Sequence, residues 1–129
     1  MQTFNSTLSE FSQDPQRNSE PVWVFHGTID EVVEKIMLEG LKVGGTQGIP
    51  IRHSQVYGPG IYTSLRSDGA LHKETKKVIV CKALKGLTAV RPQNQKLQAP
   101  YNCFADGSSM LVFREPSQLL PMYVIHFTT

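Results

Sequence analysis

The sequence predicts a single α+β domain in which a strand and a helix are followed by mostly antiparallel strands with long loops. Three features predict this class. An apolar run at 22–25 passes directly into a helical pattern, residues 42–60 are rich in glycine and proline, and β-branched runs dominate the second half. The chain has 129 residues, which is enough for one domain with a core but not for two.

Residues 1–20 are rich in Ser, Asn, Gln and charged side chains. This composition predicts a loosely held lead-in or linker before a domain at 21–129. The first element expected in the domain is a short strand at 21–26, because residues 22–25 form a continuous apolar run.

A helix is expected directly after this strand. Thr28 and Glu31 form the T-x-x-E pattern of a capping box, which marks the start of a helix. Gly40 can adopt the left-handed conformation that ends many helices. Between them, apolar side chains recur at helical spacing: Ile29, Val32, Val33, Ile36 and Met37. The first unit is therefore predicted to be strand, tight turn and helix.

The stretch 42–60 is predicted to be a long loop, of the kind that forms a functional flap or is disordered. Residues 61–64 fit either the start of a helix or a short strand end. The remaining chain is β-rich, with a polar loop expected at 91–102 after Pro92 and a connection bounded by Pro116 and Pro121. Strands are expected at 78–84, 87–90, 110–114 and 122–127.

Composition and charge exclude several classes of protein. The net charge of +2 is too weakly basic to indicate nucleic-acid binding. No apolar run is long enough for a transmembrane helix, and the polar N-terminal residues lack the apolar core of a signal peptide. Cys81 and Cys103 lie far apart without CxxC spacing, which favours two reduced structural cysteines in a cytoplasmic or nuclear protein.

Common site motifs are missing from the sequence. It has no GxGxxG turn opening a helix, no GxxxxGK[ST] loop and no GxSxG elbow. The four histidines show neither HxH nor HxxxH spacing, so we expect no metal site. On its own, the histidine in VFHGT at 24–28 is most simply a buried residue whose ring is satisfied by the backbone.

Three separated pieces of sequence occur together in order. They are FHGT (25–28), YGPGIYTS (57–64) and the tail SSMLVFREPSQLLPMYVIHF (108–127). Together they resemble the catalytic domain of the poly(ADP-ribose) polymerase-like ADP-ribosyltransferases, over roughly residues 22–127. The pieces match the H-G-T motif of that family, its G-x-G-I-Y motif and its last strands, where the acidic residue, glutamine and aromatic residue are Glu115, Gln118 and Tyr123.

This resemblance implies an α+β fold with a split antiparallel β core, few helices and long loops. It also implies that NAD binds in a cleft without a Rossmann turn and that the catalytic triad is His, Tyr and Glu. The first two positions fall on His26 and Tyr62. The third lies eight residues before Gln118 and is Met110 here, a departure from the polymerase pattern. Glu115 differs from Met110 by an odd number of residues, so an unbroken strand would turn it to the other face and we interpret it as structural.

The resemblance further implies the residues that contact NAD. Gly27 would let the backbone approach the carboxamide with no Cβ in the way, and Tyr62 would offer a flat face to the nicotinamide ring. Ala70 stands where the family has a serine and Lys73 where it has a second aromatic residue, with His72 adjacent. The positions expected to contact the co-substrate are His26, Gly27, Thr28, Tyr57, Gly60, Tyr62, Ala70 and His72.

The function implied by these residues is that of a mono-ADP-ribosyltransferase. It would use NAD as co-substrate without a metal, release nicotinamide and transfer one ADP-ribose to a protein acceptor, since a methionine can neither bind a ribose hydroxyl nor activate an acceptor. A transferase-like module that binds NAD, ADP-ribose or a protein partner without turnover is the alternative. Transfer to nucleic-acid ends is a third possibility, weakly supported by the charge.

Overall fold

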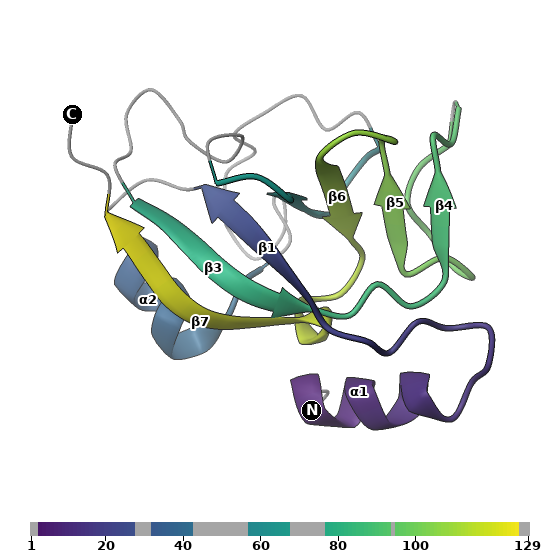
Figure 1. Cartoon of the computed structure of the whole chain (residues 1–129), viewed down its shortest axis with the longest axis horizontal. Coiled ribbons are helices and arrows are strands. Elements are labelled where there is room, and N and C mark those ends of the chain that lie inside the picture. The colour runs from purple at the N-terminus through teal and green to yellow at the C-terminus, as the bar shows by residue number, and fades with distance from the viewer. Residues whose placement is uncertain (1–2, 28–31, 43–56, 68–76, 94, 127–129) are drawn as a thin grey trace.

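The computed structural model describes residues 3–27, 32–42, 57–67, 77–93 and 95–126. Within them the strands form one seven-stranded sheet of order β4-β5-β6-β2-β1-β3-β7 (Figure 1). Neighbouring strands are antiparallel except for β4 and β5, which are parallel. The α+β class and the mostly antiparallel strands are thus confirmed. The strands are β1 (Val22–Gly27), β2 (Ile61–Ser64), β3 (Lys77–Ala83), β4 (Thr88–Val90), β5 (Cys103–Ala105), β6 (Met110–Phe113) and β7 (Leu119–His126).

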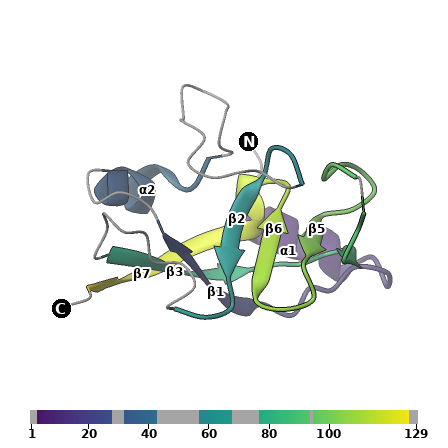
Figure 2. The ribbon, with the colours of Figure 1, turned by 90° about the horizontal axis from the view of Figure 1, so that it is seen from above.

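The two faces of the sheet carry different sets of side chains, because successive residues of a strand point to opposite sides. One face, called here the α2 face, packs beneath helix α2 (Val33–Glu39) and holds the main core, as Figure 2 shows from above. Its members include Val24, Ile61, Ile79, Cys81, Leu111 and Phe113. The opposite face, called here the Tyr62 face, carries a second cluster: Tyr62, Phe104, Met110 and Val112, with Tyr57, Leu97 and Tyr101 packed on them.

Helix α2 follows β1 and ends as the sequence predicts. Gly40 has a φ of 86° and its N–H donates to the Ile36 carbonyl at 2.7 Å. A residue with a side chain would be strained in this left-handed conformation, so the glycine fixes the end of the helix. The capping box expected at Thr28 and Glu31 lies outside the described residues.

The N-terminal segment is more ordered than its polar composition predicts. Helix α1 spans Phe4–Ser12, starts with a capping box on Thr3 and buries Thr7 and Phe11. It lies beside the short 3-10 helix η3 (Pro116–Gln118), beneath the end of the sheet opposite Gly27 (Figure 1). A loosely held segment is therefore not what the structure contains. The composition was misleading because one aromatic residue, Phe11, is enough to dock the amphipathic helix.

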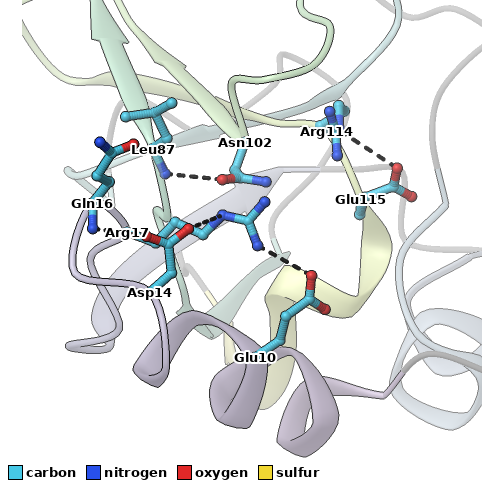
Figure 3. Close-up of polar contacts among 8 residues, drawn as sticks. All are labelled: Glu10, Asp14, Gln16, Arg17, Leu87, Asn102, Arg114 and Glu115. Atoms are coloured by element: carbon cyan, nitrogen blue, oxygen red, sulfur yellow. Dashed lines mark hydrogen bonds and ion pairs between the residues drawn. The ribbon is translucent and has the colours of Figure 1, made fainter.

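Charged side chains fix the chain that leaves α1. Arg17 donates to Glu10 at 3.1 Å and lies 3.5 Å from Asp14 (Figure 3). Its guanidinium group also stands over the Phe11 ring, 5.1 Å from the ring centroid. Asn18 and Gly86 then exchange backbone hydrogen bonds of 3.1 and 3.0 Å. The segment thus joins the loop after β3 by main-chain bonds.

The remaining elements resolve or correct the sequence predictions. Residues 61–64 form a strand, β2, rather than the start of a helix. Strand β5 was not predicted. Strand β7 begins at Leu119 and includes Pro121, which was expected to precede the strand. At Pro121 the register with β3 shifts, and β7 is the last strand of the sheet, a place where a missing N–H is tolerated.

Candidate functional site

The sheet is sparsely joined between β1 and β2. Among the described residues these strands share one register pair, Phe25 with Ser64, whereas every residue of β1 pairs with β3. The two strands are still neighbours in one sheet, and we call their sparsely paired boundary the split; His26, near the end of β1, contacts Tyr62 there. This split brings together residues that the sequence places 36 apart, as in the pair His26 and Tyr62.

His26 spans the split with its ring. Its Nδ1 lies 3.0 Å from the Tyr62 carbonyl oxygen, and since a carbonyl only accepts, we assign the proton in this contact to Nδ1. By strand alternation His26 belongs with Val24, on the α2 face, whereas the Tyr62 ring belongs to the opposite face. The two predicted residues thus meet at the split itself rather than on one face.

Tyr62 is held by its hydroxyl group. The phenol accepts a hydrogen bond from the Tyr57 N–H at 3.0 Å and donates to the Gly58 carbonyl at 2.8 Å. Burial raises the pKa of the Tyr62 phenol, and the hydrogen bond from Tyr57 opposes that rise. The ring is therefore fixed in orientation by its own preceding turn, and what it can offer a ligand is a face rather than a free hydroxyl.

Met110 lies on the same face of the sheet as Tyr62. It pairs directly with Ser64, and Tyr62 pairs with Val112, so Met110 is a diagonal neighbour of Tyr62 across β2 and β6. The Met110 side chain is half buried against the Tyr62-face cluster. Tyr62 and Met110 are thus the predicted pair that the fold brings onto one surface.

Two other predicted residues, Gly60 and Tyr57, have structural roles. A Cβ built on Gly60 would lie 2.6 Å from Val112 Cγ1, so the glycine is needed for close packing of β2 on β6. The Tyr57 ring meets Phe104 edge-on with centroids 5.4 Å apart, and the Tyr57 carbonyl accepts from the Leu97 N–H at 2.9 Å. Both residues shape the turn that holds Tyr62, and direct contact with a ligand stays a prediction.

Glu115 and Gln118 form a structural junction. Glu115 is the N-cap residue of η3 and lies outside β6. Its Oε1 lies 3.6 Å from the Arg114 Nε (Figure 3). Gln118 is buried and its Nε2 donates to the carbonyls of Leu84 and Asn102, each at 2.9 Å. The interpretation of Glu115 as structural is supported, since β6 ends at Phe113 before the residue is reached.

Asp106 is a residue near the site that sequence reasoning missed. Its Oδ1 accepts hydrogen bonds from the Ser108 N–H at 2.8 Å and the Met110 N–H at 3.1 Å, and the Asp106 N–H donates to the Met110 carbonyl at 3.2 Å. The signal was present in the sequence, because Asp-Gly before a β-branched or apolar run marks a hairpin turn. Gly107 indeed has a φ of 85°.

The other expected contact residues, Thr28, Ala70 and His72, lie outside the described part of the chain, as does Lys73. Among the described residues no group of three or more His, Cys, Asp or Glu side chains could hold a metal ion. Both thiols are buried and free of disulfides, and burial raises the pKa of Cys81 and of Cys103 to about 12. Neither cysteine is therefore a nucleophile near neutral pH.

No helix in the described ranges is long and apolar enough to span a membrane. A comparison with protein-family models finds no match for this chain, and a comparison with curated proteins finds none either. Inferences about its function therefore depend on the motifs and on the geometry around His26, Tyr62 and Met110.

Proposed function

We propose that the protein is a mono-ADP-ribosyltransferase that uses NAD as co-substrate and transfers one ADP-ribose to a protein acceptor. The observation that supports this most is the split between β1 and β2. There His26 contacts the Tyr62 backbone at 3.0 Å, and Met110 stands diagonally across from Tyr62 on one face. We infer that the sparse β1–β2 pairing is the split β core that the three sequence motifs imply.

The reaction needs little acid–base chemistry to start. When the bond between the ribose C1′ and the nicotinamide nitrogen breaks, its electron pair stays on nicotinamide, which leaves as a neutral molecule. The ribose passes through an oxocarbenium-like state, as in other glycosyl transfers. The protein's part is to orient the co-substrate and to stabilise positive charge.

Three of the expected site residues each have a physical role in this scheme. Gly27 ends β1 in register with Val78, and because it has no Cβ a carboxamide could approach it closely. Tyr62 offers a ring that its two hydroxyl hydrogen bonds hold still, which lowers the entropy lost when a second ring stacks on it. His26 joins β1 to β2 through its contact with the Tyr62 carbonyl, and in this proposal that contact keeps Gly27 and Tyr62 near one ligand.

A single transfer, rather than chain growth, follows from the chemistry of Met110. Its thioether cannot take a proton or bind a ribose hydroxyl as a carboxylate does. The acceptor would therefore be a protein side chain that is nucleophilic by itself rather than a sugar hydroxyl that needs activation. Acceptors at nucleic-acid ends receive little support from a net charge of +2.

The direct test is calorimetry with NAD and with benzamide, a nicotinamide mimic, on the parent protein and on Gly27→Val. The parent is expected to bind, and the variant is not, because a branched side chain would fill the carboxamide position. Leu38→Ala, a change at an exposed residue of α2, is the matched control and should bind as the parent does. Unchanged NAD affinity in a folded Gly27→Val protein would refute the site.

One observation favours a second function, that of a binding module without turnover. Met110 is half buried beside Leu97, Phe104 and Val112, so an apolar surface lies where the transferase reaction needs charge. A module of this kind would bind NAD or ADP-ribose and release no nicotinamide. Incubation with labelled NAD separates the two functions, since only the enzyme gives free nicotinamide and a labelled adduct.

A further inference from the structure

We propose that Asp106, in the turn that follows β5, supplies the catalytic carboxylate of the transfer site in place of the missing one at Met110. This inference rests on the proposed transferase function and names a residue that serves it. It starts from a deficit: the surface around Tyr62 and Met110 is lined by apolar and aromatic side chains, while the reaction develops positive charge at C1′.

The register of the sheet brings Asp106 to this surface. Phe104 pairs with Val112 and Ala105 with Leu111, so Asp106 continues the ladder opposite Met110, to whose carbonyl it donates its N–H at 3.2 Å. Met110 in turn pairs with Ser64. Asp106 directly follows β5, and its carboxylate lies at the hairpin end of β5 and β6, where it accepts from the Met110 N–H at 3.1 Å. Asp106, Met110 and Ser64 therefore form one row from the end of β5 across β6 and β2.

The carboxylate is anchored by one oxygen only. Oδ1 accepts from the N–H groups of Ser108 and Met110, which hold the carboxylate next to the Met110 backbone. For Oδ2, no hydrogen bond or ion pair is found within the described ranges. The nearby cation is Arg91, whose side chain packs against Gly107 in the same turn, and no ion pair joins it to Asp106 in this part of the chain. One oxygen thus fixes the group while the other remains available.

The surroundings strengthen the effect of this charge. Asp106 is half buried rather than in open water, and Met110, whose N–H it binds, packs against the apolar cluster of Leu97, Phe104 and Val112. A charge in such surroundings acts over distances of about 5–8 Å that water would screen strongly. Strands are spaced about 4.8 Å apart, so a carboxylate one strand from Met110 is within that range of a ribose bound over Met110.

The proposed step balances as follows. The C1′–N bond of NAD breaks and its electron pair leaves with neutral nicotinamide. The lone pair of the acceptor atom forms the new bond to C1′, and the proton released by the acceptor passes to Asp106 Oδ2 and then to water. Asp106 thus offsets the positive charge at C1′ and accepts the acceptor's proton. Met110 contributes packing only.

The test compares Asp106→Asn with Asp106→Ala and with the parent protein. Asparagine keeps an acceptor oxygen for both N–H groups and removes only the charge, whereas alanine also removes the turn's hydrogen bonds. We expect Asp106→Asn to bind NAD within about threefold of the parent in calorimetry and to release nicotinamide at least tenfold more slowly at saturating NAD. Asp14→Asn is the matched control, because Asp14 likewise accepts a backbone N–H, from Gln16 at 2.9 Å, beside α1.

The outcomes separate this inference from the proposed function. If the parent turns over NAD and Asp106→Asn does so at the parent rate, the assignment is wrong, and loss of activity in Asp106→Ala alone would make Asp106 a turn residue. If the parent binds no NAD, the proposed function fails and the role of Asp106 fails with it. If the parent binds NAD but releases no nicotinamide, the binding-module function replaces the enzyme and Asp106 has no catalytic role.

Discussion

The Nδ1 of His26 lies 3.0 Å from the carbonyl oxygen of Tyr62, and this contact reinforces the one register pair described between β1 and β2. We therefore expect His26→Ala to weaken the contact between β1 and β2. A single hydrogen bond contributes about 1 kcal/mol to stability, so the fold should survive. NAD binding, which needs the two strand ends at a fixed separation, should fall by more than stability does.

Urea unfolding and calorimetry on the same His26→Ala preparation measure both quantities. Ser12→Ala provides a control, since Ser12 also donates one hydrogen bond to a backbone carbonyl, that of Leu8, but does so in α1, in a different part of the sequence. If His26→Ala binds NAD with the parent affinity, His26 is a structural residue of the sheet and not part of a ligand site.

The hydroxyl and the ring of Tyr62 have separable roles. Tyr62→Phe removes the bonds to the Tyr57 N–H and the Gly58 carbonyl, and should cost about 1–3 kcal/mol of stability while leaving a ring to stack. Tyr62→Ala should also lose stacking of about 1 kcal/mol beyond the buried area. Nicotinamide release at fixed folded-protein concentration, measured beside thermal unfolding, distinguishes the two. Normal transfer by the folded fraction of Tyr62→Ala would make Tyr62 a core residue only.

Much of this fold could be predicted because local patterns and tertiary packing agree. The apolar run at 22–25 forms β1, and Gly40 ends α2. Helix α1 could not be predicted from its polar residues, since its docking depends on contacts with η3, which lies near the other end of the chain. Strand β5 is only three residues long and is defined by partners on both sides, which no local pattern encodes.

The candidate site was predictable in part for the same reason. Tyr62 and Met110 share a face because strand alternation and register follow from sequence once the pairing is known. Asp106 was missed because its place depends on a hairpin that folds it back onto the Met110 N–H. His26 was expected beside Tyr62, but it contacts the Tyr62 backbone carbonyl. Because every residue has a backbone carbonyl, the sequence could not indicate this particular contact.

The buried thiols predict a fall of stability in alkali. In the folded protein burial raises the pKa of Cys81 and Cys103 from 9.0 to about 12, whereas in the unfolded chain the thiols ionise near their ordinary value. The unfolded state therefore binds fewer protons between pH 9 and 12, and stability falls as pH rises through that window, by at most about 1.4 kcal/mol per pH unit for each thiol. Urea unfolding at pH 8, 9 and 10 measures the slope. Cys81→Ala should flatten it, and an identical slope would contradict the assignment.

Substitution of Met110 tests whether a carboxylate at this position increases turnover of NAD. Met110→Glu would place a carboxylate diagonally across from Tyr62, where it could stabilise the oxocarbenium-like state. We expect NAD hydrolysis to rise about tenfold over the parent, with products that remain single units of ADP-ribose. Polymer need not form, because the acceptor surface is unchanged. The side chains that Met110 packs against, Leu97, Phe104 and Val112, are apolar, and an unpaired carboxylate there would stay partly protonated near neutral pH. The gain should therefore be larger at pH 8 than at pH 6, as measured by nicotinamide release.

Met110→Leu keeps the apolar volume and should hydrolyse NAD as the parent does. A ladder of products from the parent protein would show that Met110 does not occupy the position of the elongating carboxylate.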